Sequence, residues 1–225
     1  MMSEKFTPEE TKDFSLAPSN HQFVWIAALS CWVGKYAVTN KEFRCFREAH
    51  DSGDFSGVSL NEDEQPAAMI SFTDAMDYSA WLMEGSNIND DFVIRVPSHE
   101  EWTAMASCGK VKRFPWGDEW PPTYGNYGDK SAKESFPEWD HIEDYDDGFP
   151  VSCPVDKAGE NEWGLVGVGG NVYEWTYEAG GTKTELRGGS WSTFQPEYLE
   201  LDNRYRREAS SSLINFGFRL ITIKI

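Results

Sequence analysis

The chain has 225 residues, 15% of them aromatic, and a formal net charge of −18 from 38 acidic and 20 basic side chains. This length suits one large domain or two small ones and is enough to bury a substantial core. The acidic excess argues against nucleic-acid binding, which needs clustered Lys and Arg, and it disfavours an anionic membrane surface. It is compatible with high solubility, a basic partner or cations.

The first residues differ from the rest of the chain. Residues 1–20 are polar and contain several acids and two prolines, so we expect an N-terminal arm or linker there. Residues 21–225 show no internal repeat and no sign of a second domain, which predicts one domain. We see neither a signal-peptide pattern nor an apolar run long enough to cross a bilayer, so we expect no membrane insertion and a cytoplasmic location.

Apolar runs rich in β-branched and aromatic residues predict β-strands along the chain. These runs are residues 23–29, 31–38, 66–72, 92–96, 185–191 and 216–223. Between 192 and 215 the sequence is polar and irregular. We therefore expect several strands together with much irregular structure.

The sequence predicts three helix starts, two of which carry a capping-box pattern. Thr39 and Glu42 form a capping-box pattern that predicts a helix over 40–49, and Ser98 with Glu101 predicts another from residue 99.

The middle helix is expected to begin after Ser71. Its apolar face is expected to contain Met76, Ala80 and Met83, and three more residues are expected to widen the apolar side: Tyr78, Trp81 and Leu82. His99, in the first turn of the third helix, is expected to be exposed to solvent.

The segment from 120 to 154 has no hydrophobic periodicity. It carries a cluster of acids at Glu138, Asp140, Glu143, Asp144, Asp146 and Asp147. A solvated acidic loop is one interpretation. Because so long an irregular segment is unusual inside a compact domain, the alternative is a hard cation held by carboxylate, amide and main-chain oxygens.

The stretch GLVGVGGNVYEW at 164–175 combines four glycines with two large aromatic residues. Glycine at this density favours a tightly wound loop over a helix. Glu174 is its one ionisable group, and a carboxylate among aromatic rings needs a cation, an Arg or backbone N–H groups as partner. The alternative is a glycine-rich turn with a surface Glu.

The four cysteines, Cys31, Cys45, Cys108 and Cys153, are widely spaced and form no CxxC pair. The spacing excludes the usual zinc motifs. Buried free thiols are the simplest expectation, with one or two disulfides as the alternative.

Six motifs, taken together and in this order, resemble the formylglycine-generating enzyme (sulfatase-modifying factor) family. They are YAVTN (36–40), RVPSHEEW (95–102), FPWGD (114–118), GLVGVGGNVYEW (164–175), RGGSW (187–191) and GFRL (217–220). The resemblance implies an α+β domain of the C-type lectin type, with a mainly antiparallel sheet, few helices and much ordered loop.

The resemblance does not fix an activity, because this family contains several functions. It includes a copper-dependent oxidase that makes formylglycine, non-haem iron sulfoxide synthases and ligand-binding variable proteins of diversity-generating retroelements. The oxidase needs two cysteines, where this chain has Thr193 and Asp202. Neither side chain replaces a thiolate ligand of Cu(I). The iron enzymes need a histidine cluster, which this sequence lacks, so we expect neither copper nor iron and no formylglycine-generating activity.

The family's calcium sites are carried over residue by residue. One would use the Asn126 side chain, the Tyr127 carbonyl, the Asp147 side chain and the Phe149 carbonyl. These are ligand types that Ca²⁺ takes, with water completing the shell.

The second family calcium site would use the carbonyls of Gly170 and Val172 and the Glu174 carboxylate. Gly167 stands where the family has a side-chain ligand, so this set lacks one group.

Our leading functional hypothesis is a non-catalytic domain that binds an unknown ligand or protein through the surface of residues 191–215. Its candidate contacts are Ser190, Trp191, Thr193, Tyr198, Asp202, Arg204, Tyr205 and Arg206. Tyr and Arg are favoured at binding hot spots, although Arg204 and Arg206 would equally suit pairing with the many carboxylates. The alternatives are a metal-dependent oxidoreductase with altered chemistry in the same pocket, and a structural subunit of a larger assembly.

Overall fold

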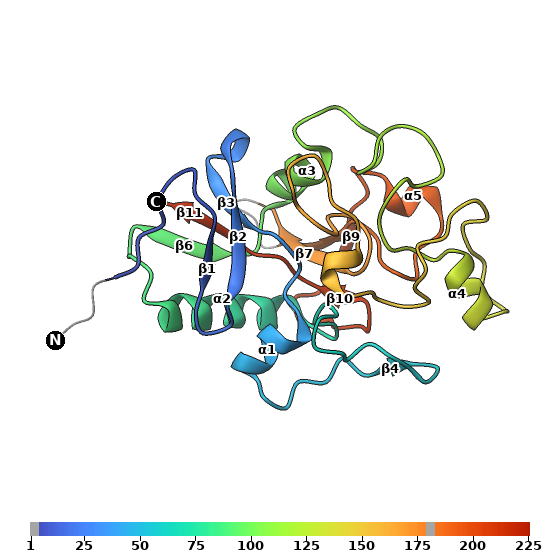
Figure 1. Ribbon diagram of the computed structural model, residues 1–225, viewed down its shortest axis with the longest axis horizontal. Helices are drawn as coiled ribbons and strands as arrows, with labels where there is room; N and C mark the ends of the chain where they lie inside the picture. The colour runs from blue at the N-terminus through green and yellow to red at the C-terminus, as the bar shows by residue number, and fades with distance from the viewer. Residues whose placement is uncertain (1–4, 179–182) are drawn as a thin grey trace.

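The computed structural model describes residues 5–178 and 183–225 and contains two main sheets (Figure 1). The larger sheet has five antiparallel strands in the order β1-β2-β3-β11-β6. Its strands are β1 (Phe14–Leu16), β2 (His21–Ile26), β3 (Cys31–Gly34), β6 (Phe92–Arg95) and β11 (Ile221–Lys224). The last strand of the chain therefore lies between two strands from its first half.

The second sheet carries most of the C-terminal half. Its four strands have the order β10-β7-β8-β9, and only the β10–β7 pair is parallel. They are β7 (Tyr173–Tyr177), β8 (Thr184–Arg187), β9 (Tyr205–Arg207) and β10 (Phe216–Gly217). A separate hairpin joins β4 (Asp54–Phe55) to β5 (Val58–Ser59).

Five α-helices and two 3-10 turns complete the described chain. The helices are α1 (Asn40–Phe46), α2 (Phe72–Ser86), α3 (His99–Ser107), α4 (Lys130–Ser135) and α5 (Pro196–Leu199), and the turns are Ala27–Leu29 and Val155–Lys157. The helices α1, α2 and α3 begin at reciprocal capping boxes made by Thr39 with Glu42, Ser71 with Asp74, and Ser98 with Glu101. The predicted helix starts are thus confirmed, because a capping box is a purely local signal.

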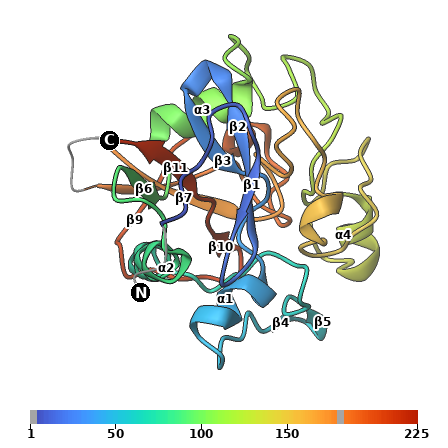
Figure 2. The ribbon, with the colours of Figure 1, turned by 60° about the vertical axis from the view of Figure 1, so that its left-hand side comes forward.

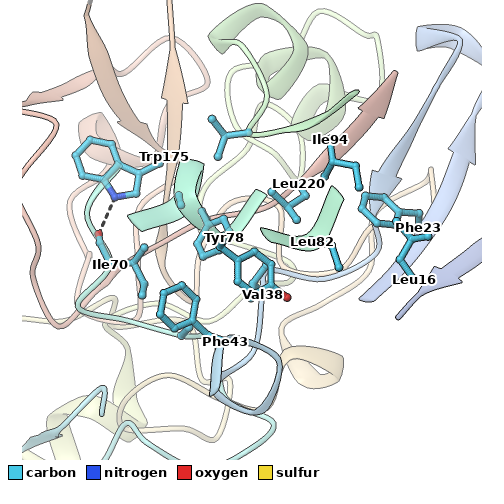
Figure 3. Packing of buried hydrophobic residues seen from close by; sticks show 14 of the residues in the cluster. Leu16, Phe23, Val38, Phe43, Ile70, Tyr78, Leu82, Ile94, Trp175 and Leu220 are labelled. Carbon is cyan, nitrogen blue, oxygen red and sulfur yellow. Dashed lines mark hydrogen bonds between the residues drawn. The ribbon is translucent and has the colours of Figure 1, made fainter. Parts of the chain in front are cut away.

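Two apolar layers cover the five-stranded sheet, with α2 on one side and α3 on the other (Figures 1 and 2). Strand alternation separates them, since Trp32 joins the cluster against α2 whereas its neighbour Val33 joins the cluster against α3. The α2 cluster includes Tyr78 and Leu82, which Figure 3 shows beside Phe23 and Phe43.

The apolar side predicted for the middle helix is right in part. Tyr78 and Leu82 are buried, and Met83 packs against the same cluster. Met76, by contrast, is 38% exposed, and Ala80 is also exposed. Apolar residues occur on more than one side of this helix, so the sequence pattern alone did not select the face that packs.

Residues 66–72 do not form the expected strand. Pro66 makes an isolated bridge to Thr39, and the Ala67 amide donates to the Val38 carbonyl at 2.8 Å. Met69 then adopts a positive φ of 58°, which turns the chain away from any ladder. The segment is irregular chain that leads into α2, and it is mostly buried apart from the exposed Met69.

Other boundaries differ in smaller ways. Part of the expected N-terminal arm forms β1, an edge strand paired with β2. The expected strand over 216–223 is two strands, β10 and β11, which belong to different sheets. The irregular segment after Ser192 contains α5 and β9.

All four cysteines are free thiols, and burial raises the pKa of both Cys31 and Cys153 to about 12. Among the helices of residues 5–178 and 183–225, none has the length and apolar character needed to span a membrane.

Candidate functional site

The glycine-rich stretch folds as a loop pressed against the long acidic segment. Gly170 has a φ of 96°, and a Cβ there would stand 2.9 Å from the Asn126 carbonyl oxygen. The next amide, of Asn171, donates to that same carbonyl at 2.8 Å. Glycine is required here because the backbone is left-handed and another main chain passes in contact with it.

Glu174 lies at the start of β7 and is only 1% exposed. Its Oε1 accepts from Nη2 of Arg219 at 2.8 Å, and its Oε2 accepts from Nε1 of Trp102 at 2.7 Å. Arg219 also donates to the carbonyls of Gly34 and Lys35, at 2.8 Å each. The sequence predicted a cation, an arginine or backbone N–H groups as partner of the Glu174 carboxylate, and the structure shows an arginine. The alternative of a surface Glu is wrong, because Glu174 is buried.

This arrangement bears on the second candidate calcium set. Gly170 and Val172 are buried beside Glu174 in the chain, and the carboxylate of Glu174 already faces a fully buried guanidinium. A cation at this carboxylate would have to share it with Arg219.

The first candidate calcium set is drawn together by the acidic segment. Asp147 accepts from the backbone amides of Tyr127 at 2.8 Å and Phe149 at 2.9 Å. The Asn126 side chain donates through Nδ2 to the Val151 carbonyl at 3.0 Å, while its buried Oδ1 finds no hydrogen-bond partner among the residues that the structure describes. A buried unpaired oxygen is costly, so this atom is available to a ligand.

The electrostatics of this segment favour a cation. Asp129, at the N-cap of α4, is fully buried and accepts a hydrogen bond from the Asp147 amide. Burial and the neighbouring Asp129 carboxylate raise the pKa of Asp147 to about 8, and burial raises the pKa of Asp129. Two carboxylates held close together in a poorly solvated place are stabilised by a bound positive charge.

The donor set fits calcium better than a transition metal. The candidate ligands are amide, carboxylate and main-chain oxygens, which Ca²⁺ accepts, and none of them is a sulfur or an imidazole nitrogen. Among the described residues, no three His, Cys, Asp or Glu side chains are grouped to hold a metal ion, so carboxylates alone do not make this site. Asp129 is an acidic neighbour that the sequence did not single out.

A cleft of about 350 Å³ opens where β7, β9, β10 and the turn after β8 meet. Its walls include the expected contacts Thr193, Tyr198 and Tyr205. The other lining residues are Tyr173, Ser192, Gln195, Asn203, Leu213, Asn215 and Phe216. We call this space the hydroxyl cleft.

Hydroxyl and amide groups form a connected network at the base of the hydroxyl cleft. Ser190 is fully buried, and its Oγ lies 3.1 Å from Ser192 Oγ and 3.2 Å from Thr193 Oγ1. Asn215 donates to both serines, and Thr193 donates to the Tyr173 hydroxyl at 3.3 Å. No carboxylate or imidazole among the described residues joins these contacts, so the network offers hydrogen bonds rather than a proton acceptor.

A second pocket of about 400 Å³ adjoins the first and shares Ser192 and Asn215 with it. Its aromatic walls are Phe55, Trp139, Trp191 and Phe194, and Glu138, Asp140 and Ile214 complete the lining. We call this space the aromatic pocket. In this pocket Trp191, one of the expected ligand contacts, lies beside Phe55 and Trp139, which come from distant parts of the chain.

The remaining expected contacts lie elsewhere. Arg206 Nε is 3.2 Å from Glu185 Oε1 and Arg204 Nη1 is 3.9 Å from Glu185 Oε2, so both arginines pair with one buried carboxylate. Asp202 lines a different cavity, near Lys112. Thr193 and Asp202, the two positions matched to the family's cysteines, therefore line separate cavities.

Several residues of the site were missed by sequence reasoning. Phe55, in the short strand β4, and Trp139 both lie in segments whose sequence is largely polar, and a large ring in such a segment was the available signal. Tyr173 and Asn215 had no local signal, because only the pairing of β10 with β7 brings them beside Ser192. His99, expected to be exposed, is 7% exposed, and its carbonyl accepts from Arg187.

Comparison with known proteins agrees with the fold and the motifs. The family model described as the sulfatase-modifying factor enzyme 1-like domain matches residues 9–224. The chain is 34% identical over 134 residues to the inactive C-alpha-formylglycine-generating enzyme 2 of Bos taurus, which covers 57% of this chain and 39% of that protein. It is 31% identical over 179 residues to the formylglycine-generating enzyme of Streptomyces coelicolor, covering 68% and 51%.

Each of these matches spans less than two thirds of the relative's own length. A solved structure, Treponema denticola variable protein 1, aligns with a TM-score of 0.64 at 16% identity, covering 95% of this chain and 92% of that one. The expected α+β fold of the C-type lectin type is confirmed. The chain belongs to the family of sulfatase-modifying factor enzyme 1-like domains.

Proposed function

We propose that this domain binds a ligand or a partner protein through the hydroxyl cleft and the adjoining aromatic pocket, without catalysing a reaction. The observation that carries the proposal is the lining of the hydroxyl cleft, in which rings, hydroxyls and amides converge and no carboxylate, imidazole, amine or thiol is among the lining residues. Such a lining positions a ligand by shape and hydrogen bonds. A cytoplasmic location is part of the proposal and accords with four free cysteines.

Absence of formylglycine-generating activity belongs to the same proposal. Thr193, at the position matched to the first family cysteine, is hydrogen-bonded to Ser190 and Tyr173. A threonine hydroxyl is a poor ligand for Cu(I), which prefers sulfur. The relatives named above include both an active and an inactive enzyme, so similarity alone does not decide between them.

We expect no formylglycine when the purified protein is incubated with copper and a cysteine peptide that an active family enzyme converts. Mass spectrometry of the peptide is the measurement, and the active enzyme under the same conditions is the control. X-ray fluorescence of the native protein is expected to show neither copper nor iron in stoichiometric amount. Conversion of the peptide, or one bound copper or iron per chain, would overturn the non-catalytic proposal.

Ligand binding itself is tested by screening small fragments with backbone amide NMR. We expect the hits to perturb resonances of residues that line the hydroxyl cleft, and to bind about tenfold more weakly to Tyr198→Ala, because Tyr is a frequent hot-spot residue. Tyr198 is 47% exposed, so its truncation should leave the fold intact. Trp120→Ala is the control, since Trp120 is an exposed ring that does not line the cleft. Hits that gather elsewhere, or that bind both variants equally, would count against the cleft.

A variable protein of the retroelement type is one version of this function. The likeness to the Treponema denticola protein supports the scaffold alone, because the sequence identity is 16%. The segment 191–215 does form walls of both pockets, which is where variation would alter the ligand.

We also propose that Ca²⁺ binds between Asn126 and Asp147, with the carbonyls of Tyr127 and Phe149 as further ligands. Support comes from the unpaired Oδ1 of Asn126 and from the raised pKa of Asp147. The bound ion would hold the two ends of the acidic segment together and would take no part in a reaction.

A further inference from the structure

The base of the hydroxyl cleft has hydrogen bonds whose direction is set from within the protein. The backbone amide of Ser190 donates to Thr193 Oγ1 at 3.1 Å, and Thr193 Oγ1 in turn donates to the Tyr173 hydroxyl at 3.3 Å. Ser190 is fully buried and Thr193 is only 5% exposed, so bulk water does not compete for these contacts. The Tyr173 oxygen therefore accepts from Thr193, and its own proton remains for a further acceptor.

Two carboxamides of the lining are held in the opposite sense. Asn215 donates through Nδ2 to Ser190 Oγ at 3.2 Å and to Ser192 Oγ at 3.3 Å. Asn203 donates through Nδ2 to the Glu197 carbonyl at 3.0 Å. Among the described residues, no donor reaches Oδ1 of either asparagine. Each amide is thus fixed by its nitrogen and keeps its oxygen for a ligand.

The lining therefore offers acceptors and a donor together, which selects the polar groups of the ligand. A carboxylate or phosphate could accept from Tyr173 but would leave both amide oxygens without a donor. An ammonium group could donate to the amide oxygens but would leave the Tyr173 proton without an acceptor. A hydroxyl group donates and accepts at once, so hydroxyls can satisfy both kinds of partner. Polar groups that stay unpaired in a binding site lower the affinity.

Charge and size narrow the ligand further. No carboxylate, imidazole, amine or guanidinium is among the lining residues, so a charged ligand would lose hydration and gain no opposite charge. The volume of about 350 Å³ is near the lower end for ligand pockets, roughly 300–1,000 Å³, which suits a single ring. Tyr198 and Leu213, 47% and 49% exposed, offer apolar surface for the C–H groups of such a ring.

We propose that the hydroxyl cleft binds a neutral polyhydroxylated ring, that is, one monosaccharide unit. This inference rests on the proposed ligand-binding function and names its ligand class. Neighbouring hydroxyls of the ring would together accept from Tyr173 and donate to Asn203 and Asn215. The candidate calcium ligands Asn126 and Asp147 are not among the residues that line the cleft, so the sugar is expected to bind without Ca²⁺.

The test compares three kinds of ring by backbone amide NMR titration of the full chain in the presence of EDTA. The first kind is glucose, galactose and mannose, each as the free sugar and as the methyl glycoside. The second is the corresponding uronic acids and 2-amino sugars, which carry a negative or a positive charge. The third is tetrahydropyran-2-methanol, which keeps the ring but has a single hydroxyl.

We expect at least one neutral sugar to perturb the resonances of residues that line the hydroxyl cleft. It should bind at least about fivefold more tightly than its charged counterparts and than tetrahydropyran-2-methanol, in line with the loss of one net hydrogen bond. Binding of methyl glycosides would identify the ligand as the end of a glycan, and binding of free sugars alone would identify it as a small metabolite.

Variants assign the binding to the cleft. Tyr173→Phe removes the hydroxyl donor and keeps the ring, so we expect sugar binding to weaken about two- to tenfold. Tyr177→Phe removes a hydroxyl from the same strand but outside the cleft and should leave binding unchanged. Asn203→Ala removes one amide oxygen and one internal hydrogen bond, so it should weaken binding with little risk to the fold. The melting temperature of each variant checks its folding.

Each outcome has a defined meaning. Failure of every neutral sugar to bind at tens of millimolar, equal binding of neutral and charged rings, or equal effects of Tyr173→Phe and Tyr177→Phe would each overturn the sugar proposal. Fragments that bind at the hydroxyl cleft would still support the general ligand-binding function in those cases. A neutral sugar that binds in EDTA and depends on Tyr173 and Asn203 would support the proposal.

Discussion

Replacing Arg219 by methionine is expected to lower the free energy of unfolding by about 3–5 kcal/mol. The variant leaves the Glu174 carboxylate in the interior with the indole N–H of Trp102 as its remaining side-chain donor. It also removes the donors that satisfy the carbonyls of Gly34 and Val166. Urea denaturation followed by tryptophan fluorescence measures the loss.

Two controls separate the buried charge from other effects of the substitution. The double variant Glu174→Gln with Arg219→Met should recover part of the stability, because it removes the uncompensated charge. Arg113→Met breaks the more exposed pair with Glu200 and should cost no more than about 1 kcal/mol. If Arg219→Met costs no more than Arg113→Met, the buried pair does not have the role assigned to it.

Addition of Ca²⁺ to protein freed of metal by EDTA is expected to raise the melting temperature by about 5–10 °C. At about one hundred times the dissociation constant, a ligand of the native state adds about 2.7 kcal/mol, and each kcal/mol shifts a domain of this size by about 2–4 °C. The physical reason is that the ion would satisfy Asn126 Oδ1 and offset the facing carboxylates of Asp129 and Asp147. Differential scanning calorimetry measures the shift.

Substitutions locate the ion. Asp147→Asn should abolish the calcium-dependent shift, and Asn126→Ala should reduce it. Asp144→Asn, an exposed acid in the same loop, should not change it. Mg²⁺ at the same concentration should raise the melting temperature less, because Mg²⁺ requires a near-ideal octahedral shell and usually keeps several of its water ligands. A shift that survives Asp147→Asn would mean that calcium acts elsewhere.

The features that could be predicted from the sequence are those with a local cause. The capping boxes at Thr39 and Ser98 predicted two helix starts correctly, because two residues three positions apart suffice to make each of them. The motif-based resemblance predicted the fold class, since the tight turns of residues 164–170 depend on glycines that can be seen in the chain. Asn126 and Asp147 were also foreseen as neighbours, from the resemblance alone.

The rest depended on contacts that only tertiary structure establishes. The partner of Glu174 is Arg219, which lies far along the chain and gave no local signal. The predicted apolar side of α2 was wrong at Met76 and Ala80, because the sheet beneath the helix, and not the helix pattern, decides which side is buried. The predicted 191–215 surface was divided between separate cavities, because Glu185 holds Arg204 and Arg206 away from the hydroxyl cleft.

The position of β11 has a consequence for how the protein is made. Ile221–Lys224 lies between β3 and β6, and Arg219 contacts the carbonyl of Gly34 across a separation of 185 residues. Contacts of such long range give no stabilisation until a very large loop has closed, which slows folding. During translation β3 therefore leaves the ribosome before β11 has been made. The edge of β3 that pairs with β11 stays unpaired until the C-terminal residues have been synthesised. Trimming the final residues by a protease would remove an inner strand of the sheet, and we expect the domain to lose its fold rather than to fray.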